Sequence, residues 1–544
     1  MPALKKLTLN GNEIGAVPAD IAALEQLEEL HLSSCALETL PVELAQLKHL
    51  RVLDVSKNND LKIPADFSQS TSLRILDVTN CNSFGITAGI PALEELCCDA
   101  CTEVSPIDFP AAILACTGLK RLSINMNSFK QIPGELTALT ALEELYMDGA
   151  LCYINELPDL SSLKNLKKIH ASGIYNYPAS PLVKQSILKG FFKITSLEEL
   201  KLDLYRRWLQ DLKQDGFDEI AKNLAHDPAR LQELSDLQAS KADFGDGRMV
   251  GHLRKPMTAE HLKGIGALQQ LRILDLSDNM LAALPEELYS LPHLRSLNLK
   301  GNSFTIDDRL QIAERLPDVD LDVRENWVPN EVIDTPSAKL WKEVADLIEA
   351  GNELWFNYAG EPLNAIKKYN EALEYFNTGK VKDKYLFLYL HYVKTNAYSN
   401  LASDDDYDDM SEEDKKKGRL TCIETGLKGL SLIPADMLPD TSMVEFYKEA
   451  IRIMGNAVAW EMHETYEDTA KMEEALALIN QAAAWVKDKS EYFIYDTKIR
   501  ILLRLGKKEE AWQLAKKTLE ENNAYSGLND ITDSKEYKQW LKKQ

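Results

Sequence analysis

Three cysteines that lie close together are the first residues in this 544-residue sequence whose spacing suggests chemistry. The run Cys97-Cys98-Asp99-Ala100-Cys101 contains the spacing C-x-x-C, whose thiolates can hold zinc. A zinc site normally needs two such pairs or a nearby pair of histidines. We therefore expect free, buried thiols in a reducing compartment here, and neither a metal nor another cofactor.

An acidic run from Asp404 to Asp414 is the second candidate, because carboxylates can bind calcium. A calcium loop of the EF-hand type has Gly at its sixth position and Glu at its twelfth. Counted from Asp404, these places hold Asp409 and Lys415. The run therefore predicts a solvated loop that caps a helix beginning after Ser411. The sequence contains no phosphate-binding loop, serine-nucleophile elbow or zinc-protease helix motif.

The most regular stretch, residues 271–302, predicts the elements that position the remaining candidates. Two matching sets recur 23 residues apart, namely Leu271, Leu274, Leu276 and Asn279, then Leu294, Leu297, Leu299 and Asn302. Alternation with period 2 turns Leu274 and Leu276 inward on a short strand, while Asp275 points to solvent. The asparagine can bond backbone groups in the following turn. One such unit cannot bury its own apolar face, so neighbours must stack on both sides.

This pattern, L-x-x-L-x-L-x-x-N, resembles the leucine-rich repeat family. It also fits at Leu4, Leu27, Leu50, Leu73, Leu93, Leu119, Leu142, Leu166 and Leu197. Prolines follow the strands at Pro18, Pro41, Pro64, Pro133, Pro158 and Pro285, and this variant resembles the bacterial and Ras-regulator-like class. The resemblance covers residues 1–330 and implies an α/β solenoid with a parallel sheet on its concave face. In this register Cys98 takes the third leucine position, and Cys35, Cys81 and Cys101 take the asparagine position.

The repeat period fails between Leu197 and Leu271, where the step is 74 residues. We expect an irregular insertion at about residues 204–265, in which one degenerate repeat near Leu231 and Leu234 would fit. Insertions into repeats often lie on the binding face, although packing onto the solenoid is an equal alternative. The candidate binding residues of this segment are Tyr205, Arg207 and Trp208.

The two ends of the solenoid differ. Residues 321–326 should cap it, because the leucine ladder there gives way to charge. The chain already begins with a repeat strand at Leu4, without a polar cap, so we expect further residues upstream. No secretory segment follows Met1 and no run of about 18 apolar residues occurs, which predicts a cytoplasmic protein without membrane insertion.

The concave face, meaning the solvent-facing side of the predicted sheet, carries the other candidate binding residues. They are His31, Asp54, Asp77, Tyr146, Asp148, His170 and Lys201. Neighbouring strands lie about 4.8 Å apart, so His31, Asp54, Asp77 and Cys97 should form a row. Adjacent aspartates cost energy unless a cation or donor lies between them. The row is therefore either a hydrated ladder or the site of a metal-binding sensor.

Residues 335–544 change to helical spacing and resemble tetratricopeptide repeats. Gly351, Ala365, Tyr369 and Ala372 match one unit, with small residues where two helices approach closely. Ala511, Ala515 and Thr518 belong to a last unit. Two intermediate units would use Cys422, Gly426, Gly429 and Pro434, and Gly455, Ala475, Ile479 and Ala482 with a long insertion. Residues 533–543, with Tyr537, Trp540 and Leu541 at helical spacing, read as a capping helix.

Cys422 raises an enzymatic alternative. Bacterial leucine-rich-repeat ubiquitin ligases resemble this chain in joining a solenoid to a helical domain with a nucleophilic cysteine. Their motif is Cys-x-Asp, whereas this chain has Cys422-Ile423-Glu424. The cysteine also fits a small-residue packing position, so we do not expect an enzyme.

The net charge of −23 and the pI near 5.0 argue against nucleic acid as a partner, because phosphate binding needs a concentrated basic surface. A protein or peptide partner, basic in character, fits better. Both repeat resemblances imply binding on concave surfaces. We therefore expect a non-enzymatic interaction scaffold, with the ubiquitin-ligase-like enzyme and the metal-binding sensor as alternatives and the oligomeric state left open.

Overall fold

The computed structural model describes residues 4–61, 67–82, 84, 88–102, 106–151, 154, 156–172, 185–203, 257–324, 335–356, 362–403, 410–439, 441–488, 491–522 and 526–543. The chain divides into two compact units. One comprises Met1–Asp308 and Arg315–Asn330, and the other Arg309–Glu314 and Glu331–Gln544.

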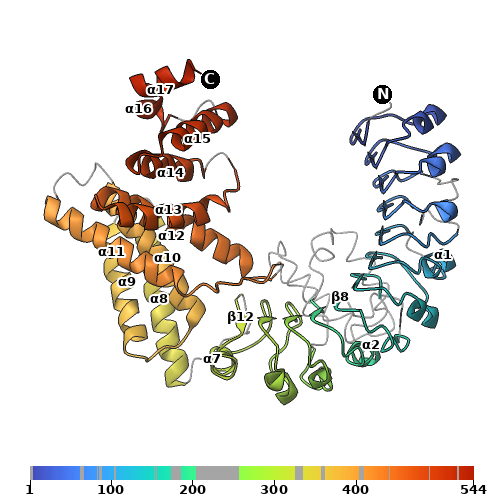
Figure 1. Ribbon diagram of the computed structural model, residues 1–544. Helices are drawn as coiled ribbons and strands as arrows, with labels where there is room; N and C mark the ends of the chain where they lie inside the picture. Colours follow the sequence, from blue (N-terminus) through green and yellow to red (C-terminus); the bar gives the residue numbers. More distant parts are fainter. Residues whose placement is uncertain are drawn as a thin grey trace, which may run out of the picture. The chain divides into compact units, whose positions relative to one another are not determined.

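The first unit is built on a 12-stranded parallel sheet whose strands follow one another in chain order (Figure 1). The strands are β1 Lys6–Thr8, β2 Glu29–His31, β3 Val52–Asp54, β4 Ile75–Asp77, β5 Glu95–Cys97, β6 Arg121–Ser123, β7 Glu144–Tyr146, β8 Lys168–His170, β9 Glu199–Lys201, β10 Ile273–Asp275, β11 Ser296–Asn298 and β12 Asp320–Asp322. The first eleven each begin two residues after a predicted leading leucine. The prediction of a leucine-rich-repeat solenoid is confirmed.

The middle residue of each strand points into the core. Leu30, Leu53 and Leu76 are fully buried and lie in register on neighbouring strands. Asn58 follows β3 and is 1% exposed. Its Nδ2 donates to Leu32 O at 3.0 Å, and its Oδ1 accepts from Cys35 N at 2.9 Å and Leu37 N at 3.0 Å. The asparagine thus ties each turn to the repeat before it.

The cysteines at the asparagine position do the same with fewer bonds. The thiols of Cys35, Cys81 and Cys101 donate to Leu9 O, Val55 O and Val78 O, each at 3.1 Å. Cys98 is fully buried at the third leucine position. The structural interpretation of these four cysteines is confirmed.

Short helices return the chain on the other side of the repeats. Four of the 3-10 helices begin directly after a proline, which is the N-cap residue and has an extended backbone. These are η1 Ala19–Ala23, η2 Val42–Gln46, η4 Gly134–Ala138 and η6 Glu286–Ser290. The others are η3 Phe67–Gln69, η5 Ile265–Ala267, α1 Ala111–Leu114, α2 Gln185–Phe191 and α7 Ile306–Arg315.

The repeats on either side of the long irregular segment are neighbours in the sheet. β9 pairs directly with β10, with Glu199 opposite Ile273. A degenerate repeat is expected near Leu231 and Leu234. Those two leucines, like all of residues 204–256, lie outside the described residues. Met257, Leu262 and Ile265, which the predicted insertion included, are buried in the repeat that leads into β10.

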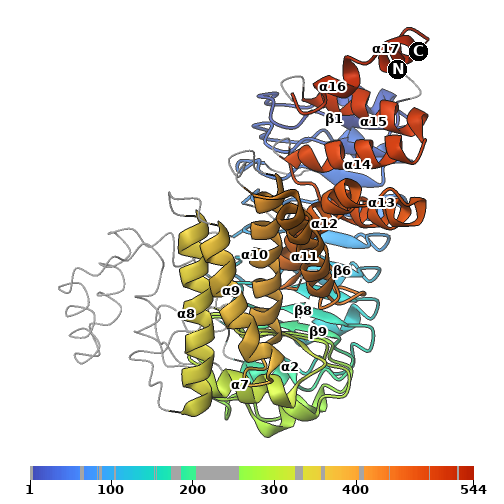
Figure 2. The ribbon, with the colours of Figure 1, turned by 90° about the vertical axis from the view of Figure 1, so that its left-hand side faces the viewer.

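The second unit is helical (Figure 2). Its described helices are α8 Pro336–Phe356, α9 Pro362–Asn377, α10 Lys384–Ser403, α11 Glu412–Leu430, α12 Val444–Thr465, α13 Thr469–Ala483, α14 Phe493–Arg504, α15 Lys508–Glu521, α16 Asn529–Thr532 and α17 Lys535–Leu541. Successive helices pack as pairs, α8 with α9, α10 with α11, α12 with α13 and α14 with α15. A Cβ on Gly351 would meet the Tyr369 ring at 2.4 Å, so the predicted close approach of α8 and α9 is confirmed.

One detail of the helical prediction is wrong. The extra length between Gly455 and Ala475 is not an insertion, because α12 continues to Thr465 and α13 begins at Thr469. In α17, Tyr537 and Trp540 are buried, but Leu541 is 42% exposed.

Candidate functional site

The concave face consists of the first and third residues of each strand. Apart from Asp148 in the turn after β7, the sequence-based choice on this face took the third residue of a strand, between the two inward leucines, and so missed the first. Alternation with period 2 places both on the same side. The missed residues include Glu29, Arg121, Glu144, Lys168 and Glu199.

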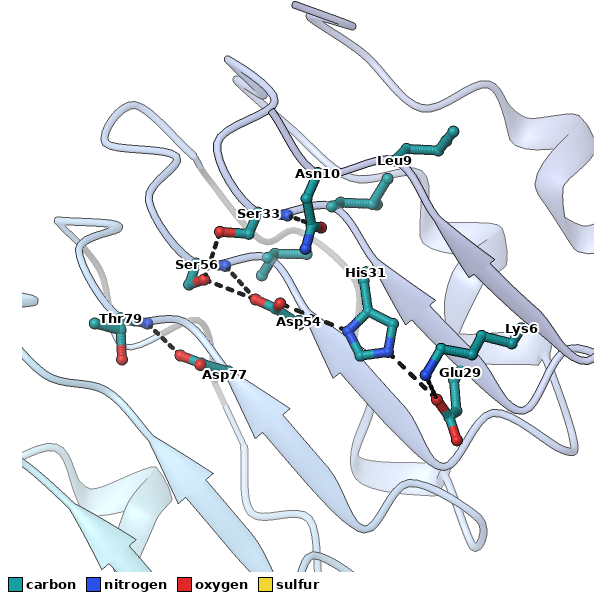
Figure 3. Close-up of polar contacts among 12 residues, drawn as sticks. Lys6, Leu9, Asn10, Glu29, His31, Ser33, Asp54, Ser56, Asp77 and Thr79 are labelled. Carbon is teal, nitrogen blue, oxygen red and sulfur yellow. Dashed lines mark hydrogen bonds and ion pairs between the residues drawn. The ribbon is translucent and has the colours of Figure 1, made fainter. Parts of the chain in front are cut away.

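The Asp54 row consists of His31, Asp54, Asp77 and Cys97 on the neighbouring strands β2 to β5, as predicted. Figure 3 shows the first three of these side chains. His31 Nδ1 lies 3.6 Å from Asp54 Oδ2. Asp54 Oδ1 accepts from the backbone N of Ser56 at 3.1 Å and from its hydroxyl at 2.7 Å. Donors from the following turn thus lie within hydrogen-bonding distance of the Asp54 carboxylate.

Asp77 is bonded in the same way, since its Oδ1 accepts from Thr79 N at 2.9 Å. Burial raises the pKa of Asp77, and the charge of Asp54 adds to the rise. Burial also raises the pKa of the Cys97 thiol, with Asp77 contributing. Over the part of the chain that the structure describes, no three His, Cys, Asp or Glu side chains converge as a metal would require.

The Tyr146 cluster consists of Arg121, Glu144, Tyr146, Lys168, His170, Glu199 and Lys201 on strands β6 to β9. The Tyr146 hydroxyl donates to Glu144 Oε2 at 2.7 Å. The Arg121 guanidinium carbon lies 4.9 Å from the centre of the Tyr146 ring, and the His170 ring meets that ring edge-on at 4.7 Å. The tyrosine is therefore held in one orientation before any partner arrives.

Glu199 joins the cations of this cluster. His170 Nε2 lies 2.7 Å from Glu199 Oε1, Lys201 Nζ lies 3.4 Å from the same oxygen, and Lys168 Nζ lies 3.3 Å from Oε2. Burial raises the pKa of Glu199, but the hydrogen bond to His170 and the two lysine charges outweigh it and hold the pKa at about 2. The structure thus brings together three predicted residues, Tyr146, His170 and Lys201, through a residue that the prediction missed.

Asp148 lies in the turn after β7, where its side chain accepts a hydrogen bond from the backbone of the next repeat. Its Oδ1 accepts from Ser172 N at 2.8 Å. Asp203 lies two repeats on, where it accepts from the Ser172 hydroxyl. Burial and the nearby charge of Asp275 raise its pKa to about 7. The predicted residues Tyr205, Arg207 and Trp208 lie outside the described residues.

Cys422 lies in the core of the helical unit. The residue is fully buried on α11, and its thiol donates to Thr395 O at 3.5 Å. Burial raises the pKa of this thiol well above its usual value, which suits packing rather than nucleophilic attack. The predicted cap of the same helix is confirmed, because the Ser411 hydroxyl accepts from Asp414 N at 3.1 Å. Asp404 to Asp409 of the acidic run lie outside the described residues.

Comparisons with known proteins identify the repeats. The family model described as "Leucine rich repeat" matches residues 2–61 and 263–304. Among solved structures, the chain is similar to an internalin from Listeria monocytogenes, with 18% identity over 62% of this chain and 78% of the other and a TM-score of 0.38. A leucine-rich repeat protein from Leptospira interrogans shares 21% identity over 59% of this chain and 84% of its own, with a TM-score of 0.25. The Toll–Spatzle complex from Drosophila shares 15% identity over 58% of this chain and 32% of its own, with a TM-score of 0.31. No curated protein matches the sequence.

Folds of this kind generally act as scaffolds for protein–protein interaction. Among the helices that the structure describes, none combines the length and the apolar character that crossing a membrane requires. The stacked strands, the buried asparagines that follow them and the family match all indicate leucine-rich repeats. The chain thus contains leucine-rich repeats, and a helical unit follows them.

Proposed function

We propose that the concave face of the repeats binds a protein or peptide partner, and that the chain acts as a non-enzymatic scaffold. The observation that carries this proposal is the preorganised Tyr146 cluster. Interface hot spots favour Tyr, Trp and Arg, and they favour side chains that lose little freedom on binding. Tyr146 is already oriented by Glu144, Arg121 and His170.

The Asp54 row supports a basic character of the partner. Asp54 and Asp77 lie side by side on β3 and β4, with Val52 and Ile75 two residues before them on the same face. A lysine or arginine side chain can place its aliphatic stem on such apolar residues and its charge at the carboxylates. The net charge of −23 would also speed the approach of a basic partner.

The test is a peptide-display selection against the full chain, followed by affinity measurements on the selected peptides. Tyr146→Ala should weaken binding more than tenfold, about 1.4 kcal/mol. The matched control is Tyr289→Ala, because Tyr289 lies on η6 rather than on the sheet and also carries a guanidinium over its ring, that of Arg315 at 3.5 Å. Peptides whose affinity falls equally in both variants, or in neither, would place binding away from the concave face.

The metal-binding alternative is tested on the same protein. Elemental analysis of the purified chain should find no stoichiometric zinc, calcium or manganese, because the carboxylates of Asp54 and Asp77 already accept hydrogen bonds from their own turns. One metal per chain that is lost in the Asp54→Ala, Asp77→Ala double variant would favour the sensor instead.

A further inference from the structure

His31 lies between two carboxylates at the β2 end of the Asp54 row (Figure 3). Its Nε2 lies 3.4 Å from Glu29 Oε2 on the same strand, and its Nδ1 lies 3.6 Å from Asp54 Oδ2 on β3. A neutral imidazole carries one N–H and can donate to only one of these carboxylates, whereas an imidazolium carries two and can donate to both. Protonation of the ring therefore changes how it meets Asp54.

The two oxygens of Asp54 have different neighbours. Oδ1 accepts hydrogen bonds from the backbone N and the hydroxyl of Ser56, whereas Oδ2 faces His31. The side chains of Asp54 and His31 are both 21% exposed, so a molecule on the concave face can reach them. Because the turn already engages Oδ1, a basic group of a partner would meet this carboxylate at Oδ2, beside the His31 ring.

The strands on either side of β2 supply the other groups around the ring. Thr8 lies opposite His31 on β1 and carries no charge. Lys6, also on β1, places its Nζ 2.6 Å from Glu29 Oε2, the oxygen that faces His31 Nε2. Glu29 is thus already paired with a cation. On β3 the residue opposite His31 is Asp54, so its carboxylate is the charge that protonation of His31 affects most.

We propose that His31 is a pH switch for the binding of a basic partner at the Asp54 row, an inference that rests on the function proposed above. Histidine is the side chain that ordinarily changes charge between about pH 5 and pH 8. Neutral His31 leaves Asp54 Oδ2 to an ammonium or guanidinium group of the partner. Protonated His31 competes for the same oxygen and repels the incoming cation. The partner is therefore held at neutral pH and released on acidification.

The probe is the basic peptide acetyl-pentalysine-amide, whose affinity for the full chain is measured by calorimetry at low, fixed ionic strength. Between about pH 7.5 and pH 5.5 the affinity should fall about tenfold, because binding linked to one proton changes at most tenfold per pH unit. His31→Gln cannot take up the proton and should lose most of this fall. His31→Lys keeps a positive charge throughout, so it should bind the peptide weakly at both pH values.

The matched control is His49→Gln. His49 is exposed in the turn before β3, outside the concave face, so this variant should keep the fall in affinity. Asp77 is the other titratable neighbour of Asp54, and burial raises its pKa. A pH dependence that came from Asp77 would persist in His31→Gln. The full fall in His31→Gln, or an equal loss of the fall in His49→Gln, would overturn the proposal.

Nuclear magnetic resonance of the His31 ring gives a second readout, with the signal assigned by its loss in His31→Gln. By linkage, a peptide that prefers the neutral ring should lower the pH at which the ring is half protonated. Asp54→Asn separates this result from the proposed function. If that variant binds pentalysine unchanged at neutral pH, the basic partner and the switch both fail. If it weakens binding but saturating peptide leaves the half-protonation pH unchanged, only the switch fails.

Discussion

Glu199→Gln tests whether the Tyr146 cluster depends on one buried carboxylate. The substitution keeps the size of the side chain but removes the charge shared by His170, Lys168 and Lys201. The side chain of Glu199 is only 12% exposed, so water cannot replace the lost interactions. A carboxyl held at a pKa of about 2 instead of 4.5 corresponds to about 3 kcal/mol in favour of the folded state at neutral pH.

The pH dependence of this effect has a definite sign. Because the pKa of Glu199 is lowered on folding, its contribution is fully present above pH 4.5 and is lost as the pH falls toward about 2. The stability difference between the original chain and Glu199→Gln should therefore shrink over that window. Repeat proteins can open locally, so the appropriate measurement is hydrogen exchange of peptides covering β8 and β9, made across this pH range.

Glu29→Gln is the matched control. Glu29 occupies the same register position on β2, lies 2.6 Å from Lys6 Nζ and 3.4 Å from His31 Nε2, and is 38% exposed. Exposed ion pairs contribute little, so this variant should leave exchange at β2 almost unchanged. A cost for Glu199→Gln no larger than that for Glu29→Gln, or one that does not vary with pH, would refute the reasoning.

Four further outcomes are expected. Leu53→Ala should cost about 2 to 5 kcal/mol by chemical denaturation, because a fully buried side chain leaves a cavity. Asn58→Ala should cost about 2 to 5 kcal/mol by the same assay, since it leaves two buried backbone donors without an acceptor, and clearly more than Cys35→Ala, which removes one thiol hydrogen bond. Cys422→Ala should preserve binding and cost at most about 2 kcal/mol, and a ubiquitin thioester trapped on Cys422 would contradict this. Burial raises the pKa of Glu461 to about 7, so stability from this group is lost as the pH rises from 4.5 through 7, and melting curves of Glu461→Gln should lack that loss.

The repeat fold could be predicted because each repeat carries the same spacing of leucines in the sequence. Leu30, Leu53 and Leu76 follow a fixed spacing, and a parallel stack is the arrangement that buries all of them. The role of Cys35 was also predictable, since a thiol donor can stand where Asn58 places an amide. Departures from the rule were not predictable. The 74-residue step between two leading leucines gave no sign that β9 would pair directly with β10.

The candidate site was predicted only in part, because a repeat pattern places side chains on a face without giving their partners. It placed Asp54 beside Asp77 correctly and recognised that a donor or a cation had to lie near them. Whether a donor is present depends on the conformation of the following turn, where Ser56 and Thr79 present their N–H groups to the carboxylates. That conformation is a property of the stacked repeats rather than of either aspartate.

The limit is clearest in a tetrapeptide that occurs four times. The motif Leu-Glu-Glu-Leu enters β2, β5, β7 and β9, and its second glutamate is Glu29, Glu95, Glu144 or Glu199. The side chains of these four residues are 38%, 27%, 39% and 12% exposed. Glu199 differs because Lys168 precedes it in register on β8 and because His170 and Lys201 close over it, whereas Glu29 lies between Lys6 and Val52. The local sequence therefore does not distinguish the burial of the four glutamates. The order in which the repeats stack decides which of them is buried among cations.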